Sequence, residues 1–74
     1  MALRKRTLRL AQHNTSVALE PEFWTALEQL ATARGQTLAK FVASVDAERQ
    51  GGLASALRVA VLQQTVQAAT GLVE

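Results

Sequence analysis

The spacing of apolar residues changes at one dipeptide, Glu20-Pro21. Before it, Thr15, Val17 and Leu19 alternate with small or polar residues, as in a strand with one apolar side. After it, apolar residues recur at helical intervals. A strand of about five residues cannot form a sheet alone, because its backbone N–H and C=O groups would lack partners. What the chain can fold into therefore depends on where a second strand comes from.

The chain is short and has few means of reinforcing a small core. A chain of 74 residues buries only about 60% of the surface that it exposes when unfolded. It contains no Cys and one His, so disulfides and a metal site are excluded, and no cofactor is expected. Apolar residues make up 49% of the chain and charged residues 19%, which suggests that a second subunit covers part of the apolar surface. We therefore expect a homodimer.

Basic residues are concentrated at the start of the chain. Residues 1–19 carry four basic and no acidic residues, a formal charge of +4, whereas residues 20–74 carry four basic and six acidic residues, a charge of −2. A basic arm on a nearly neutral body is typical of attraction to nucleic acid, and a solvated, solubilising arm is the alternative. No apolar run approaches the roughly 20 residues of a membrane span. The basic start is not followed by a signal-peptide segment, so we expect a cytoplasmic protein with no membrane partner.

The segment Thr7–Leu10 also alternates, with Leu8 and Leu10 on one side, and could form a further strand. The residues that connect it to the next strand contain neither Gly nor an Asn-Gly pair, so a hairpin is not strongly indicated. The sequence therefore favours a flexible or loosely paired arm, with a second strand as the alternative.

Two helices are predicted between clear boundary residues. The first has Glu20 near its cap and Pro21 in its first turn and ends at Gly35, and the second begins after Thr37, a favourable N-cap residue. Their apolar stripes are Phe23, Leu27, Leu30 and Ala31, with Trp24 on the flank, and then Leu38, Phe41, Val42 and Val45.

A third helix is predicted from about Leu53 to about Ala69. It is apolar around much of its circumference, because Val59, Leu62 and Val66 lie on a different side from Leu57 and Val61. Such a helix must be covered on two sides, which again favours a dimer.

Strand, helix, glycine turn and helix in this order resemble the ribbon-helix-helix family of small DNA-binding proteins. The likeness is carried by Ser16-Val17-Ala18-Leu19, by Leu27, Leu30 and Ala31, by Gly35-Gln36-Thr37 and by Phe41-Val42. The segments "TSVALEPEFW", "DAER" and "LASALRVAVL" are similar to a group of short bacterial proteins with such a domain. The resemblance implies a mostly α-helical, intertwined homodimer with one short β-strand per chain, paired with its own copy, and an additional C-terminal helix. Residues 1–13 would be the basic arm, 14–50 the ribbon-helix-helix core, and 51–74 the C-terminal helix and tail.

The resemblance also implies a role for each part of the chain. A two-stranded antiparallel ribbon would enter the major groove of DNA, with base contacts from Asn14, Ser16 and Ala18. Base readout would be thin, because no Arg or Lys lies on this outer strand face. Phosphate contacts would come from Arg4, Lys5, Arg6, Arg9, Thr37, Leu38, Ala39 and Lys40. The dimer core would comprise Val17, Leu19, Phe23, Leu27, Leu30, Phe41, Val42, Val45, Leu57 and Val61.

These features predict a transcriptional regulator that binds a short palindromic site on double-stranded DNA, as a homodimer or a pair of dimers. One alternative is an antitoxin-like protein in which the third helix and the tail from Gln63 hold a partner protein. Another is a dimerising interaction module that does not bind DNA. Catalysis is not expected, because the only His lies in the basic arm and no phosphate-binding glycine loop is present.

Overall fold

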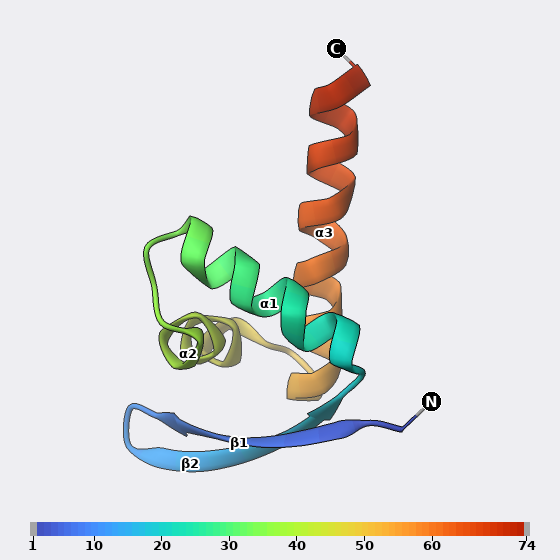
Figure 1. Ribbon diagram of the computed structural model, residues 1–74. Helices are drawn as coiled ribbons and strands as arrows, with labels where there is room; N and C mark the ends of the chain where they lie inside the picture. The colour runs from blue at the N-terminus through green and yellow to red at the C-terminus, as the bar shows by residue number, and fades with distance from the viewer. Residues whose placement is uncertain (1, 74) are drawn as a thin grey trace.

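Two strands and three helices make up the chain. The computed structural model describes the backbone of residues 2–73 and the side chains of residues 2–66. The elements are β1 (Arg4–Leu10), β2 (His13–Leu19), α1 (Pro21–Ala33), α2 (Leu38–Glu48) and α3 (Leu53–Val73). Figure 1 shows the two strands as a layer along one side of the molecule, with the helices on one face of it. The C-terminal half of α3 extends away from the strands, past α1.

The second strand of the sheet comes from the same chain. β1 and β2 pair antiparallel, with Thr7 opposite Ser16 and Leu10 opposite His13. The expectation of one strand per chain is therefore wrong, as is the preference for a flexible arm. The two strands are connected by two residues, Ala11-Gln12. No residue other than glycine has a positive φ between residues 2 and 73, so this turn needs neither Gly nor Asn-Gly.

The core lies between the inner face of the hairpin and the helices. Leu8, Leu10, Val17 and Leu19 point inward from the strands, and each buried Leu contributes about 1.5–3 kcal/mol relative to an exposed one. The helices contribute Trp24, Leu27, Ala31, Phe41, Val42 and Leu57.

Most residues predicted for a dimer core lie in the core of one chain. Val17, Leu19, Leu27, Phe41, Val42 and Leu57 are buried, and Phe23, Leu30, Val45 and Val61 pack against them partly exposed. The predicted stripe of α1 is rotated, because Trp24 rather than Phe23 is buried. Leu8 and Leu10 join this core from the segment that the sequence left as an arm.

The turn between α1 and α2 follows the prediction. Gly35 has a φ of 66°, a left-handed conformation that glycine adopts without a steric penalty. The backbone N–H of Gln36 donates to the carbonyl of Ala31 at 2.9 Å and that of Gly35 to Thr32 at 3.0 Å, the two bonds of a Schellman motif. Thr37 caps α2, since its Oγ1 accepts from the backbone N–H of Lys40 at 3.1 Å.

The third helix is longer than predicted and is packed on one side. It ends at Val73 rather than near Ala69. Leu57 is fully buried, whereas Val59, Leu62 and Val66 are 47%, 60% and 55% exposed. Within the described residues, the side of α3 that carries Val59 and Leu62 is therefore not covered by a second layer.

Candidate nucleic-acid interface

Six side chains project from the face of the hairpin that points away from the helices. Because side chains alternate along a strand, the inward residues Leu8, Leu10, Val17 and Leu19 fix which positions lie outward. The outward set is Lys5, Thr7 and Arg9 from β1 and Asn14, Ser16 and Ala18 from β2. Ala18 is partly buried and the other five are exposed. We call these six residues the outer face.

The strand register arranges the outer face in three cross-strand pairs. Lys5 lies opposite Ala18, and Arg9 lies opposite Asn14. Between them, Thr7 Oγ1 and Ser16 Oγ are hydrogen-bonded at 3.0 Å. Two positive charges therefore flank a central hydroxyl pair, and no acidic residue belongs to the outer face. The expectation that no Arg or Lys would lie on this face is wrong, because it considered β2 alone.

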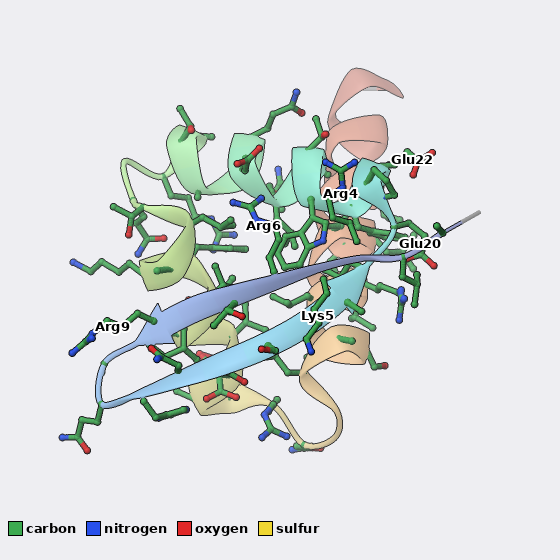
Figure 2. The ribbon with its side chains drawn as sticks, turned by 60° about the horizontal axis from the view of Figure 1, so that its bottom comes forward. Arg4, Lys5, Arg6, Arg9, Glu20 and Glu22 are labelled. Atoms are coloured by element: carbon green, nitrogen blue, oxygen red, sulfur yellow. The ribbon has the colours of Figure 1, made fainter. Side chains whose placement is uncertain are left out.

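The side chains of the four basic residues of β1 point in two directions, either towards α1 or away from the helices. Figure 2 shows Arg4 and Arg6 on the α1 side of β1, Lys5 lying across the ribbon, and Arg9 extending near the loop. Only Lys5 and Arg9 of the predicted phosphate contacts belong to the outer face.

Arg6 is engaged with the body of its own chain. Its guanidinium carbon lies 5.0 Å from the centre of the Trp24 ring, a cation–π arrangement. Its Nη1 also lies 3.4 Å from Glu28 Oε2. Both partners of this ion pair are substantially exposed, so the pair contributes at most about 1 kcal/mol. These contacts direct Arg6 away from the outer face and hold β1 against α1.

The start of α2 lies elsewhere on the molecule. α2 is on the helix side of the sheet (Figure 1), so its N-terminus does not belong to the outer face. Leu38 and Ala39 occupy its first turn, where backbone N–H groups have no partner within the helix. Lys40 is exposed, and its backbone N–H is already bonded to Thr37.

An ion pair secures the corner where the ribbon meets α1. Arg58 Nη2 and Nε donate to Glu20 Oε1 at 3.0 and 3.1 Å. A backbone hydrogen bond at Glu20 and this side-chain bond from Arg58 lower the pKa of the Glu20 carboxyl. Arg58 also lies 5.8 Å from the centre of the Phe23 ring. The carboxylate of Glu20, directly after β2, is thereby paired with the guanidinium of Arg58 from α3.

Two other kinds of site have no basis in the described part of the chain. Among these residues, no three His, Cys, Asp or Glu side chains come together in a way that could hold a metal ion. Within the same residues, no helix combines the length and apolar character needed to cross a bilayer.

The chain has a two-stranded antiparallel ribbon followed by two helices that are joined by a glycine turn. This arrangement is that of a small ribbon-helix-helix protein. The family model described as the ribbon-helix-helix domain matches residues 3–65. The chain therefore belongs to the ribbon-helix-helix family, whose members typically dimerise and bind DNA.

One solved structure is similar over nearly the whole chain. It is that of an uncharacterized protein from Bordetella pertussis Tohama I, with a TM-score of 0.80 and 30% sequence identity. The match covers 95% of this chain and 61% of that one, so this chain spans less than two thirds of the length of its relative. No curated protein matches the chain.

Proposed function

We propose that this protein is a cytoplasmic DNA-binding transcriptional regulator that inserts its β1–β2 ribbon into the major groove of double-stranded DNA. The observation that carries this proposal is the outer face. It is a largely exposed surface on a two-stranded ribbon, it has Lys5 and Arg9 on either side of its centre, and it contains no acidic residue. Membership of the ribbon-helix-helix family supports it independently.

The dimensions and chemistry of the ribbon suit the groove. Strands lie about 4.8 Å apart, and a major groove about 12 Å wide admits such a pair with its side chains. Asn14 offers a donor and an acceptor to adenine, and Ala18 offers a methyl contact to thymine. Lys5 and Arg9 add positive charge next to the DNA, which favours binding by releasing counterions. Arg4, Lys40 and the backbone N–H groups of Leu38 and Ala39 are proposed as phosphate contacts beside the groove.

Salt dependence of binding to a mixed-sequence duplex tests the proposal. The variant Lys5→Gln, Arg9→Gln should bind more weakly and lower the salt slope by about two per bound chain, because each lost contact removes about 0.9 from the slope. The matched control is Arg34→Gln, Arg49→Gln, which removes the same charge at the C-terminal caps of α1 and α2. The control should keep the wild-type slope. Absence of binding by the wild-type protein at low salt would contradict the proposal.

A protein partner on α3 is the second candidate function, and the exposed apolar residues of that helix favour it. Val59 and Leu62 are 47% and 60% exposed. They line a groove of about 370 Å³ together with Phe23 and Arg58. We propose that a second copy covers this side in the homodimer, with an antitoxin-like partner as the alternative. The tail predicted to hold such a partner lies largely beyond Val66, outside the described side chains.

Light scattering distinguishes these possibilities for α3. If a second copy covers the helix, Leu62→Gln should lower the molar mass of the free protein towards that of one chain. Its matched control is Gln63→Ala, a change at the next position of the same helix. An unchanged mass for Leu62→Gln would contradict the α3-mediated dimer.

A further inference from the structure

We infer that the exposed face of α3 is the seam of a parallel two-stranded coiled coil that this helix forms with α3 of a second copy. This inference rests on the proposed cover of α3 by a second copy. It deepens that proposal by naming the residues in contact and the relative direction of the two helices. α3 follows the ribbon, α1 and α2 in the chain, so this contact is separate from any contact made by the strands.

The exposed apolar residues of α3 follow a heptad pattern. Val59, Leu62 and Val66 are 47%, 60% and 55% exposed. The intervals between them are three and four residues, and in the sequence Ala69 and Val73 continue the same alternation. Alternating intervals of three and four apolar residues define positions a and d of a coiled coil. We call Val59, Leu62 and Val66 the seam.

The residue types of the seam favour a pair of helices over a larger bundle. Val59 and Val66 occupy position a, and Leu62 occupies position d. In parallel coiled coils, β-branched residues at position a combined with Leu at position d favour two strands over three or four. The seam therefore suits one further helix.

The opposite side of α3 is occupied by its own chain. Leu57 is fully buried, and Leu53, Ala54, Ala60 and Val61 pack against the core. In the heptad that the seam defines, these five residues fall at positions b, c and f, which lie farthest from a coiled-coil partner. A second α3 on the seam would therefore give this broadly apolar helix cover on both sides, as such a helix requires.

The charges beside the seam favour a second copy over a charged partner. Residues 59–73 contain no Asp, Glu, Lys or Arg, so two copies of this stretch meet without like charges. Arg58, at position g, is paired with Glu20 through Nε and Nη2. In a parallel pair, position g lies beside position e of the facing helix, which is Gln63. An amide oxygen there can accept a hydrogen bond from the Arg58 guanidinium.

The position of the strand layer favours parallel rather than antiparallel helices. α3 starts close to the strands and extends away from them (Figure 1). In a parallel pair, the strand layers of both copies therefore lie at the same end of the dimer, where one DNA duplex can contact both. An antiparallel pair would place the two layers at opposite ends.

Single cysteines introduced into the seam test both the contact and its direction. The chain contains no Cys, so each variant carries one thiol. Val59→Cys and Val66→Cys replace residues at position a, about 10.5 Å apart along the helix, and in a parallel pair each lies beside its own copy. Both variants should therefore form disulfide-linked dimers when the free protein is oxidised. Thr32→Cys, an exposed position of α1, is the control and should migrate as one chain on a non-reducing denaturing gel.

The contrary results separate this inference from the proposals on which it builds. An antiparallel pair brings a residue beside its own copy only at the two-fold axis. Linkage at one position alone would therefore overturn the parallel seam but leave the cover of α3 by a second copy intact. Linkage at neither position would overturn the seam, and a wild-type mass of one chain would overturn that cover as well. DNA binding is measured separately by its salt dependence.

A pair of oppositely charged variants tests the seam without oxidation. Val59 is 47% exposed, so one chain should fold with a charge at this position. Val59→Glu and Val59→Lys should each have the molar mass of one chain where the wild type is a dimer, because like charges would meet at position a. An equal mixture should recover the dimer, because parallel helices bring the opposite charges together. A dimer of either variant alone, or a mixture that keeps the mass of one chain, would overturn the inference.

Discussion

The indole Nε1–H of Trp24 donates a hydrogen bond to the backbone carbonyl of Arg4 at 2.8 Å. This bond joins the first turn of α1 to the first residue of β1. Trp24 is 3% exposed, and Arg6 stacks on its ring. One buried side chain thus satisfies its own polar atom and fixes the outer strand of the ribbon to the helical layer.

Loss of this bond should destabilise the fold measurably. Trp24→Phe keeps an aromatic ring but removes the donor, and it should lower the free energy of unfolding by about 1–3 kcal/mol. Urea denaturation followed by circular dichroism measures the change. Arg6→Gln serves as the comparison and should cost less than about 1 kcal/mol, because its cation–π contact and ion pair are partly exposed. A wild-type midpoint for Trp24→Phe would contradict the role given to this bond.

A side chain at Gly35 should destabilise the turn after α1. A Cβ there would meet no atom within 4 Å, so the cost of Gly35→Ala comes from the positive φ alone and should be about 1–2 kcal/mol. Gly35→Asn should lose less, because Asn adopts this conformation more readily. Gly51→Ala is the matched control, since it has neither a crowded Cβ nor a positive φ. Its melting temperature should stay near that of the wild type.

The two sides of α3 should respond differently to the same truncation. Leu57 is fully buried, so Leu57→Ala should cost about 2–5 kcal/mol. Leu62 is 60% exposed, so within one chain Leu62→Ala should change stability by less than about 0.5 kcal/mol. Chemical denaturation at several protein concentrations measures both. The second copy proposed to cover this side would make the loss for Leu62→Ala grow with protein concentration, whereas a small loss at every concentration would contradict that cover.

Acid should weaken the contact between Glu20 and Arg58. Backbone and Arg58 hydrogen bonds lower the pKa of the Glu20 carboxyl in the folded chain. A carboxyl with a lowered folded pKa stabilises the fold above its unfolded pKa, and this contribution is lost as the pH falls through the folded value. Urea midpoints at about pH 7 and about pH 3 should therefore fall further for the wild type than for Glu20→Gln. Parallel decreases in the two proteins would rule out this linkage.

Much of the chain could be read from local pattern alone. The alternation from Thr15 to Leu19 predicted which side chains of β2 face the helices. It also predicted that Asn14 and Ser16 point away from them. Gly35 and Thr37 marked the boundaries of α1 and α2, because left-handed backbone and helix capping each require particular side chains.

Other features depend on tertiary context that no local pattern contains. The pairing of β2 with β1 is accompanied by packing of Leu8 and Leu10 and by the hydrogen bond of Trp24, all of which lie outside the strand itself. The same holds for the outer face, because Lys5 and Arg9 join Asn14 only once the register is known. Phe23 and Trp24 are adjacent in α1, and Trp24, whose indole donates to the carbonyl of Arg4, is the one that is buried.

The pairing of adjacent strands within one chain also affects how the ribbon forms. Only the two residues Ala11 and Gln12 separate β1 from β2, and hairpins with such short connections form in about 1–10 μs. The step is first order, so its rate does not fall when the protein is diluted. A molecule present in a few copies can thus complete the surface proposed to read DNA without first encountering a second copy.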